Sequence, residues 1–198
     1  MRPLFAVPLV ALTLACSDLR PSERGAGGNG NGGAGATGGM GGGEEPMGGD
    51  PVRRRFDASS VAVSYVSAND HTVVVAERAA QGGDVDRLTV ELFYGLGADP
   101  GAHSASLGDN YADCHTCALV FVACDQNAQC VAALWASSGT LTVNANNKND
   151  GEPFRATLSD ARFDEVTIDP NSFESTPVAG GISWCIDSIT LDATVMVR

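Results

Sequence analysis

The sequence predicts an all-β fold for residues 56–198, and three features lead to this prediction. Apolar residues occur there in short runs that either alternate with polar residues or are wholly apolar. Gly, Asn and Asp separate these runs, and amphipathic helical spacing is nearly absent. Short strands with frequent turn signals are typical of antiparallel sandwiches and barrels. We therefore expect a single antiparallel β-sandwich or jelly-roll-like domain after a disordered glycine-rich linker.

The expected strands differ in how many of their faces are apolar. In the segment 88–94, one face carries Leu88, Val90, Leu92 and Tyr94, and the other carries Thr89 and Glu91. This alternation predicts one buried face and one solvent-exposed face. Residues 118–123 are apolar on both faces, which indicates a central strand or one covered by a loop. Polar residues 146–151 predict a hairpin turn. In chain order, the expected strands are 61–66, 72–76, 88–94, 118–124, 131–136, 140–145, 154–158, 165–168 and 183–197.

The N-terminus has the layout of a signal peptide over residues 1–15. One arginine is followed by an apolar run and a small residue directly before Cys16. The run is shorter than the ~20 residues that a spanning helix needs. Residues 12–16 (Leu-Thr-Leu-Ala-Cys) resemble the lipobox of bacterial lipoproteins, with Thr13 where that family usually has leucine. The resemblance implies that a lipid joins the sulfur of Cys16 and that the chain is cut before it.

A lipidated Cys16 would anchor the protein in a membrane, because two or three palmitate-type acyl chains hold firmly where one does not. In lipoproteins of two-membrane bacteria, an aspartate after the cysteine favours the inner membrane, whereas this chain has Ser17. The resemblance therefore implies the outer membrane, with either the periplasmic or the outer face possible. The alternative is an ordinary secretory peptide cut near Ala15.

Residues 16–55 are expected to form a flexible tether. Fourteen of the twenty-five residues from Gly25 to Gly49 are glycine, and no apolar pattern is present. Such a stretch stays a random coil because glycine loses much entropy on ordering and offers no side chain to bury. Twenty-five coil residues span roughly 25–30 Å. The cluster Arg53–Arg55 then reads as a solvated junction between tether and domain.

The charge of the expected domain argues against nucleic acid as a partner. From Arg53 onward there are 19 acidic residues against 9 Lys and Arg, a net charge of −10. Such a surface repels phosphates.

Five cysteines remain once Cys16 is assigned to lipid, and an exported chain favours their pairing. Cys124 ends one expected strand and Cys130 begins the next, so antiparallel pairing would place them opposite each other at a distance that a disulfide spans. Cys185 is expected to form a disulfide with Cys114 or Cys117, which leaves the other of these two cysteines unpaired.

The Cys114-His115-Thr116-Cys117 motif has three further interpretations. A redox motif of this kind begins a helix, whereas this one enters a strand. Haem attachment needs histidine after the second cysteine, where Ala118 stands. Zinc would need a second pair of ligands. We expect structural disulfides and no cofactor.

No catalytic residue can be assigned from the sequence, which contains neither Gly-x-Ser-x-Gly nor His-Glu-x-x-His. The three histidines, His71, His103 and His115, are expected to be solvent-exposed. A histidine in a cleft beside a carboxylate and a hydroxyl would instead favour an enzyme. Trp135 and Trp184 are expected in the core, with sugar stacking as the alternative. Oxygen donors that could bind calcium occur in two acidic loops, for which solvated turns are the alternative: Asp84, Asp86, Asp109 and Asp113.

The whole layout resembles lipoproteins of myxobacteria-like soil predators, with a lipobox, a glycine-rich tether and a small disulfide-bearing β domain. The likeness includes residues 109–114, 117–120, 175–181 and 184–185. It implies no catalytic residues, since these relatives are uncharacterised. We expect an exported, membrane-anchored, non-enzymatic module that binds an envelope or cell-surface ligand or supports the envelope. The alternative is a secreted hydrolase acting on envelope or extracellular polymers.

Overall fold

The computed structural model describes residues 52–99, 101 and 103–198. The expected signal peptide at residues 1–15, Cys16 with its expected lipid and nearly all of the expected tether lie outside these residues. Three short 3-10 turns, η2 (Ser67–Asn69), η3 (Gln81–Gly83) and η4 (Tyr94–Leu96), connect strands. The strands are β1 (Val52–Arg53), β2 (Ser60–Val66), β3 (His71–Ala79), β4 (Val85–Phe93), β5 (His103–Ser106), β6 (Thr116–Cys124), β7 (Ala132–Asn146), β8 (Pro153–Ile168), β9 (Ser175–Pro177) and β10 (Ser183–Val197).

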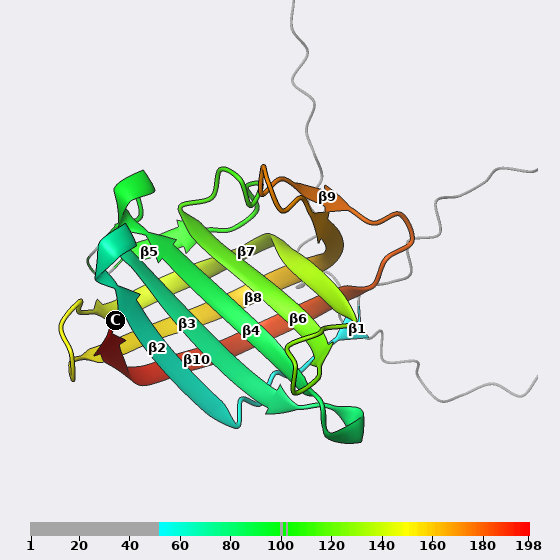
Figure 1. Ribbon diagram of the computed structural model, residues 1–198, viewed down its shortest axis with the longest axis horizontal. Helices are drawn as coiled ribbons and strands as arrows, with labels where there is room; N and C mark the ends of the chain where they lie inside the picture. Colours follow the sequence, from blue (N-terminus) through cyan, green and yellow to red (C-terminus); the bar gives the residue numbers. More distant parts are fainter. Residues whose placement is uncertain (1–51, 100, 102) are drawn as a thin grey trace, which may run out of the picture.

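The prediction of an all-β fold is confirmed, but the expected sandwich or jelly-roll arrangement is not. One continuous sheet closes on itself through seven strands in the order β10-β2-β3-β4-β6-β7-β8, because β10 also pairs with β8. In Figure 1, β2, β3, β4 and β6 lie side by side on one wall, and β8 and β10 cross behind them at a large angle. Most pairings are antiparallel, and β10 pairs in parallel with both β1 and β2. The result is a closed barrel.

The barrel interior holds the main hydrophobic core. Alternate residues of each strand point inward, among them Val90 on β4, Val120 on β6 and Phe163 on β8, each at most 1 % exposed. Trp184 belongs to this core and Trp135 to a smaller one, so the prediction that both are buried is confirmed. Fully burying an aliphatic or phenyl side chain contributes about 1.5–3 kcal/mol.

The smaller hydrophobic cluster lies on the outer face of the barrel. Cys117 and Leu119 of β6 alternate with its inward residues and pack there with Cys114, Trp135 and Val166. This explains why the sequence of β6 is apolar on both faces, as expected for a strand covered by a loop. The segments that form the cover, residues 107–115 and 169–182, position both sites described below.

Strands β7 and β8 change register where the barrel bends. Their pairing shifts between Ala136 and Thr140, and Gly139 lies at the shift with φ +135°. A Cβ atom on Gly139 would lie 2.8 Å from Cα of Ala161, closer than real Cβ contacts come. Glycine is therefore required here for both its conformation and its size.

The sheet extends into residues that the sequence assigned to the tether. Val52 and Arg53 pair with Trp184 and Cys185 of β10, and the Arg54 N–H donates to the Cys185 carbonyl at 2.8 Å. Arg53, Arg54 and Arg55 are exposed, as expected for a solvated junction.

Two disulfides are formed among the described residues. Cys124 bonds to Cys130, with Cα atoms 3.9 Å apart, which confirms the pairing predicted from hairpin register. Cys114 bonds to Cys117, so the prediction that Cys185 joins one of them is wrong. The reason is topological: Cys185 lies on β10 next to β1 and β8, whereas Cys117 begins β6 between β4 and β7.

Candidate functional site

Two segments that are distant in sequence lock together over the outer face of β7 and β8. The side chain of Asn110 donates to the Ser175 carbonyl at 2.9 Å, and the Ser175 N–H donates back to Asn110 Oδ1 at 2.9 Å. Trp135 Nε1 donates to the Asp109 carbonyl at 2.6 Å, which fixes the first segment to β7. These contacts satisfy the polar groups that the cover buries.

An open cleft of about 530 Å³ lies between these segments and the strands beneath them. This volume is in the ~300–1,000 Å³ range of small-molecule sites. Asn110, Ser175 and residues 177, 178, 180 and 181 line it from the two covering segments, while Trp135, Asp164 and Ser183 come from β7, β8 and β10. Two of the three glycines lining it, Gly108 and Gly181, lie so close to neighbouring residues that a Cβ would clash, 2.9 Å from the Ser137 carbonyl oxygen and 2.8 Å from Glu165 Cβ respectively.

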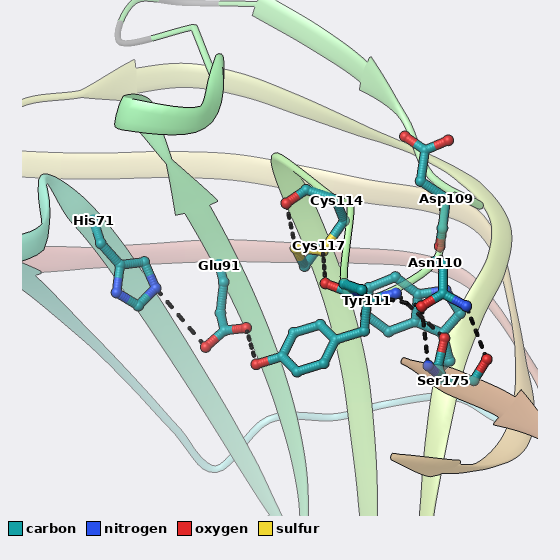
Figure 2. The surroundings of a disulfide bond; sticks show 10 residues. His71, Glu91, Asp109, Asn110, Tyr111, Cys114, Cys117 and Ser175 are labelled. Carbon is teal, nitrogen blue, oxygen red and sulfur yellow. Dashed lines mark hydrogen bonds and ion pairs between the residues drawn. A yellow bond between two sulfur atoms is a disulfide. The ribbon is translucent and has the colours of Figure 1, made fainter. Parts of the chain in front are cut away.

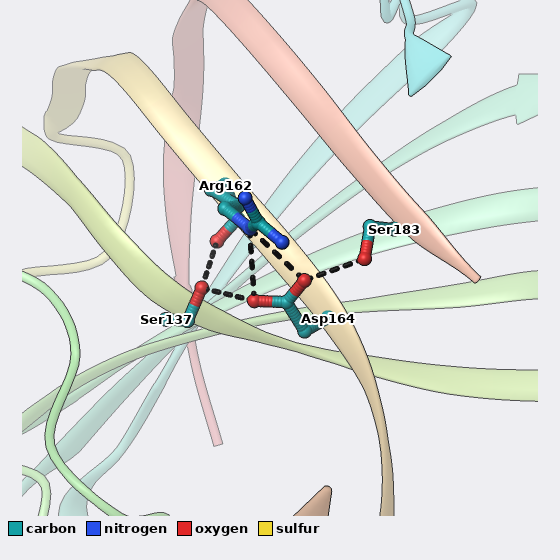
Figure 3. Close-up of polar contacts among 4 residues, drawn as sticks. All are labelled: Ser137, Arg162, Asp164 and Ser183. Atoms are coloured by element: carbon teal, nitrogen blue, oxygen red, sulfur yellow. Dashed lines mark hydrogen bonds and ion pairs between the residues drawn. The ribbon is translucent and has the colours of Figure 1, made fainter. Parts of the chain in front are cut away.

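Asp164 is the organising residue of this cleft (Figure 3). Its carboxylate accepts a hydrogen bond of 2.5 Å from the Ser137 hydroxyl and one of 2.6 Å from the Ser183 hydroxyl. Arg162 Nε lies 3.0 Å from one carboxylate oxygen and 3.1 Å from the other. Adjacent strands supply all four groups, since Asp164 pairs with Trp135 on β7 and with Ser183 on β10.

These contacts keep Asp164 ionised. Burial alone would raise its pKa, but the hydrogen bonds from Ser137 and Ser183 and the charge of Arg162 outweigh burial and lower the pKa below its ordinary value. A carboxylate with a lowered pKa is a poor general base. No histidine lines the cleft among the residues that the structure describes. The two serines therefore lack the activating base that a nucleophile needs, and the arrangement is suited to binding.

A second pocket, of about 360 Å³, lies on the outer face of β3 and β4. Figure 2 shows His71, Glu91 and Tyr111 in a row, from β3, β4 and the segment before β6. The Tyr111 hydroxyl donates to Glu91 Oε2 at 3.0 Å, and His71 Nε2 lies 3.8 Å from Glu91 Oε1. The side chains of His71 and Glu91 are only 12 % and 13 % exposed. His71 also stacks on Phe93, with ring centroids 4.2 Å apart.

Burial shifts all three titrating groups of this pocket toward their neutral forms. It raises the pKa of Glu91 against the opposing effect of the Tyr111 hydrogen bond, and it lowers the pKa of His71. Burial and the nearby Glu91 charge raise the pKa of Tyr111. Glu91 is thus a carboxylate whose charge the surrounding protein compensates poorly.

The four acidic residues considered for calcium do not form one site. Asp84 and Asp86 flank the start of β4, whereas Asp109 and Asp113 precede β6 beside the far end of β4. Asp86 is buried and accepts hydrogen bonds from the Arg78 guanidinium and the Ala123 N–H, which is a structural role. Within the described ranges, no group of three or more His, Cys, Asp or Glu could hold a metal. Asp109 instead borders the cleft.

The histidines differ from the expectation that all are exposed. His115 is exposed, whereas His71 is largely buried in the second pocket and His103 is half-buried. His103 and His115 line a further pocket of about 250 Å³. His71 lies beside a carboxylate and a hydroxyl, but the Tyr111 hydroxyl donates to Glu91 and not to His71. No activated nucleophile results from this geometry.

The sequence did not point to Asp164, Ser137, Ser183 or Glu91 as site residues. The alternation of the sequence places Glu91 on a solvent-exposed strand face. Phe93 lies on the same face, and this large apolar residue is a signal that other segments cover that face. Asp164 precedes Glu165 in a strand with regular alternation, and nothing local distinguishes it from a solvated carboxylate.

Fold and sites together define an all-β domain with a closed sheet and an open cleft on its outer face. No protein-family model, curated protein or solved structure matches the chain. The part of the chain that the structure describes contains no helix with the length and apolar character needed to cross a membrane.

Proposed function

We propose that this chain is an exported lipoprotein, anchored to the outer membrane through Cys16, whose β domain is a non-enzymatic binding module. The anchor and tether rest on the signal peptide, the lipobox-like residues before Cys16 and the glycine-rich stretch that follows. The ligand that fits the cleft best is a neutral, hydroxyl-rich one, a saccharide segment of an envelope or extracellular polymer.

The observation that carries this proposal is the arrangement of acceptors in the cleft. Asp164 fixes the hydroxyls of Ser137 and Ser183, whose oxygen lone pairs can accept hydrogen bonds from a ligand. Glu165 and Ser175 add a carboxylate and a hydroxyl to the lining, and together these groups suit the paired donors and acceptors of sugar hydroxyls. These side chains come largely from paired strands, and sites on strands are held more rigidly than sites on loops. The acidic character of the cleft disfavours anionic ligands.

Titration with a panel of soluble oligosaccharides (chitohexaose, cellohexaose and maltohexaose) and cosedimentation with purified peptidoglycan sacculi test the proposal. We expect at least one to bind and to remain uncleaved after prolonged incubation. Asp164→Asn should weaken binding about tenfold, equivalent to ~1.4 kcal/mol, because the charged acceptor that orients the Ser137 and Ser183 hydroxyls is lost. Asp192→Asn is a matched control, since Asp192 is an exposed carboxylate that pairs with Arg155 across the β8–β10 ladder, away from the cleft. Absence of binding, or equal loss in the control, would contradict the proposal.

The alternative is a hydrolase acting on such polymers, and the position of His71 beside Glu91 is the observation that favours it. Hydrolysis of a glycosidic bond commonly needs two carboxylates about 5–9.5 Å apart. Glu91 is the only carboxylate among the described residues that line its pocket. Release of reducing ends from any panel member would support the hydrolase in place of the binding module.

A further inference from the structure

We infer that the pocket formed by His71, Glu91, Phe93, Tyr111 and Phe173 binds the ammonium group of a primary alkylamine. This ammonium pocket is a second binding site on the outer face of the barrel. It is separate from the Asp164 cleft, and the inference does not depend on what that cleft binds.

Glu91 supplies the charge that such a ligand needs. One carboxylate oxygen, Oε2, accepts the Tyr111 hydroxyl, while Oε1 has His71 Nε2 at 3.8 Å, beyond hydrogen-bond reach. No Lys or Arg is among the described residues lining the pocket. A largely buried carboxylate gains most from a cation that arrives with its own hydrogen-bond donors.

His71 supplies an acceptor for the same group. Its Nε2 atom is buried and has no hydrogen-bond partner among the described residues. Burial lowers the pKa of His71, which favours the neutral ring whose Nε2 can accept. An ammonium group has three donors. Entering between the two side chains, whose facing atoms are 3.8 Å apart, it would widen that gap and donate to both Glu91 Oε1 and the enclosed His71 Nε2. The unpartnered His71 Nε2 would thereby gain a hydrogen bond and Glu91 a cationic partner.

Aromatic rings supply the rest of the pocket. Phe93 stacks on His71, and the Tyr111 and Phe173 rings meet edge to face with centroids 6.3 Å apart. The faces of aromatic rings attract cations, and the rings also pack on an alkyl chain. Leu96 at the rim, 60 % exposed, extends this apolar surface outward.

Phe173 is held at the pocket at a conformational cost. It is 55 % exposed and has φ +59°, a left-handed conformation that is unfavourable for a bulky side chain. Its N–H donates to the Asp169 carbonyl at 2.9 Å, and Asp169 Oδ1 accepts the N–H groups of Asn171 and Ser172. The loop is therefore organised to present an aromatic ring that the core does not need.

A neutral or anionic ligand fits these features less well. An anion would be repelled by Glu91. A purely apolar ligand would displace water from Glu91 Oε1 without replacing it and would leave His71 Nε2 without a partner, which costs free energy. The charge of an alkylammonium, its donors and its hydrocarbon chain each match a different part of the pocket.

Titration of the ¹⁵N-labelled full chain with n-hexylammonium chloride, followed by amide chemical shifts, tests the inference. We expect saturable binding with the largest shifts in β3, β4 and residues 111–114 and 173. 1-Hexanol, which has the same chain without the charge, should bind at least tenfold more weakly. Equal binding of hexanol, no saturable binding, or shifts confined to the Asp164 cleft would overturn the inference.

Two variants locate the charge and the aromatic contribution. Glu91→Gln preserves shape and should weaken hexylammonium binding at least tenfold, whereas Glu152→Gln, a matched change at an exposed carboxylate, should leave it unchanged. Phe173→Ala removes an exposed ring, so it does not endanger folding, and should weaken binding about threefold. Equal loss of hexylammonium binding in Glu91→Gln and Glu152→Gln would mean that net charge alone attracts the ligand, and this would overturn the inference. Unchanged binding in Phe173→Ala would likewise count against the pocket.

Discussion

The pair formed by Arg78 and Asp86 provides a quantitative test of how the β3–β4 end of the barrel is held. Nε and Nη2 of Arg78 donate to one oxygen of Asp86 at 2.9 and 2.7 Å, and the Ala123 N–H donates to the other at 2.9 Å. The two charged side chains are only 17 % and 6 % exposed. Asp86→Ala would leave a largely buried guanidinium and a backbone N–H without this acceptor.

We expect Asp86→Ala to lower the free energy of unfolding by about 3–5 kcal/mol, the usual cost of removing one partner of a buried pair. For a domain of this size, that corresponds to a fall in Tm of roughly 6–20 °C. Glu77→Ala is the control, because the Glu77–Arg87 pair lies on the same strands but is 32 % exposed at each end. An exposed pair of this kind contributes only about 0–1 kcal/mol.

Urea denaturation and thermal unfolding of the full-length variants measure both effects. A loss below about 1 kcal/mol in Asp86→Ala, or one equal to that of Glu77→Ala, would refute the reasoning.

The same samples test the calcium interpretation of the acidic loops. A calcium-dependent rise in the Tm of the unaltered chain that Asp86→Ala abolishes would restore that interpretation in place of a structural role.

Three further predictions follow from other features. Cys16→Ser should move the protein from the membrane to the soluble fraction without changing its circular dichroism, and a Cys16 peptide found in a disulfide by mass spectrometry would contradict lipidation. Gly139→Ala should destabilise by at least about 1 kcal/mol more than Gly151→Ala in urea, because both glycines have positive φ but only Gly139 contacts Ala161. Burial raises the pKa of Glu91 in the folded state, so ionisation of Glu91 opposes folding once the pH rises above the ordinary glutamate pKa. Glu91→Gln should therefore have a higher Tm than the unaltered chain at pH 7 and the same Tm near pH 3, where Glu91 is neutral. A lower Tm for Glu91→Gln at pH 7 would contradict the assigned burial of charge.

The local parts of the fold could be predicted from the sequence, because they depend on alternation and turn residues. The two apolar faces of β6 predicted its covered position, and hairpin register predicted the Cys124–Cys130 disulfide. The Cys114–Cys117 bond was missed, because the expectation that Cys185 pairs with one of them required β10 to approach β6. Strand order is a property of the whole sheet, and it places these cysteines apart.

The sites were harder to predict, because each depends on segments that fold back over the sheet. Alternation assigns Glu91 and Asp164 to the outer face of the barrel but does not say what covers that face. The cover forms through contacts such as Asn110 with Ser175, which are 65 residues apart. Closure of the sheet is similarly non-local, since sandwiches and barrels share the same strand pattern.

The position of β10 has a consequence for the order in which the strands of the barrel can pair. β10 follows every other strand in the chain, yet it pairs with β8 along most of its length and with β2 at Val195–Val197. Until it arrives, β2 and β8 keep unpaired edges that invite association with other chains. Non-local pairing of this kind is slow. If the chain is exported N-terminus first, as the proposed function implies, the barrel would therefore remain open until its final strand has emerged.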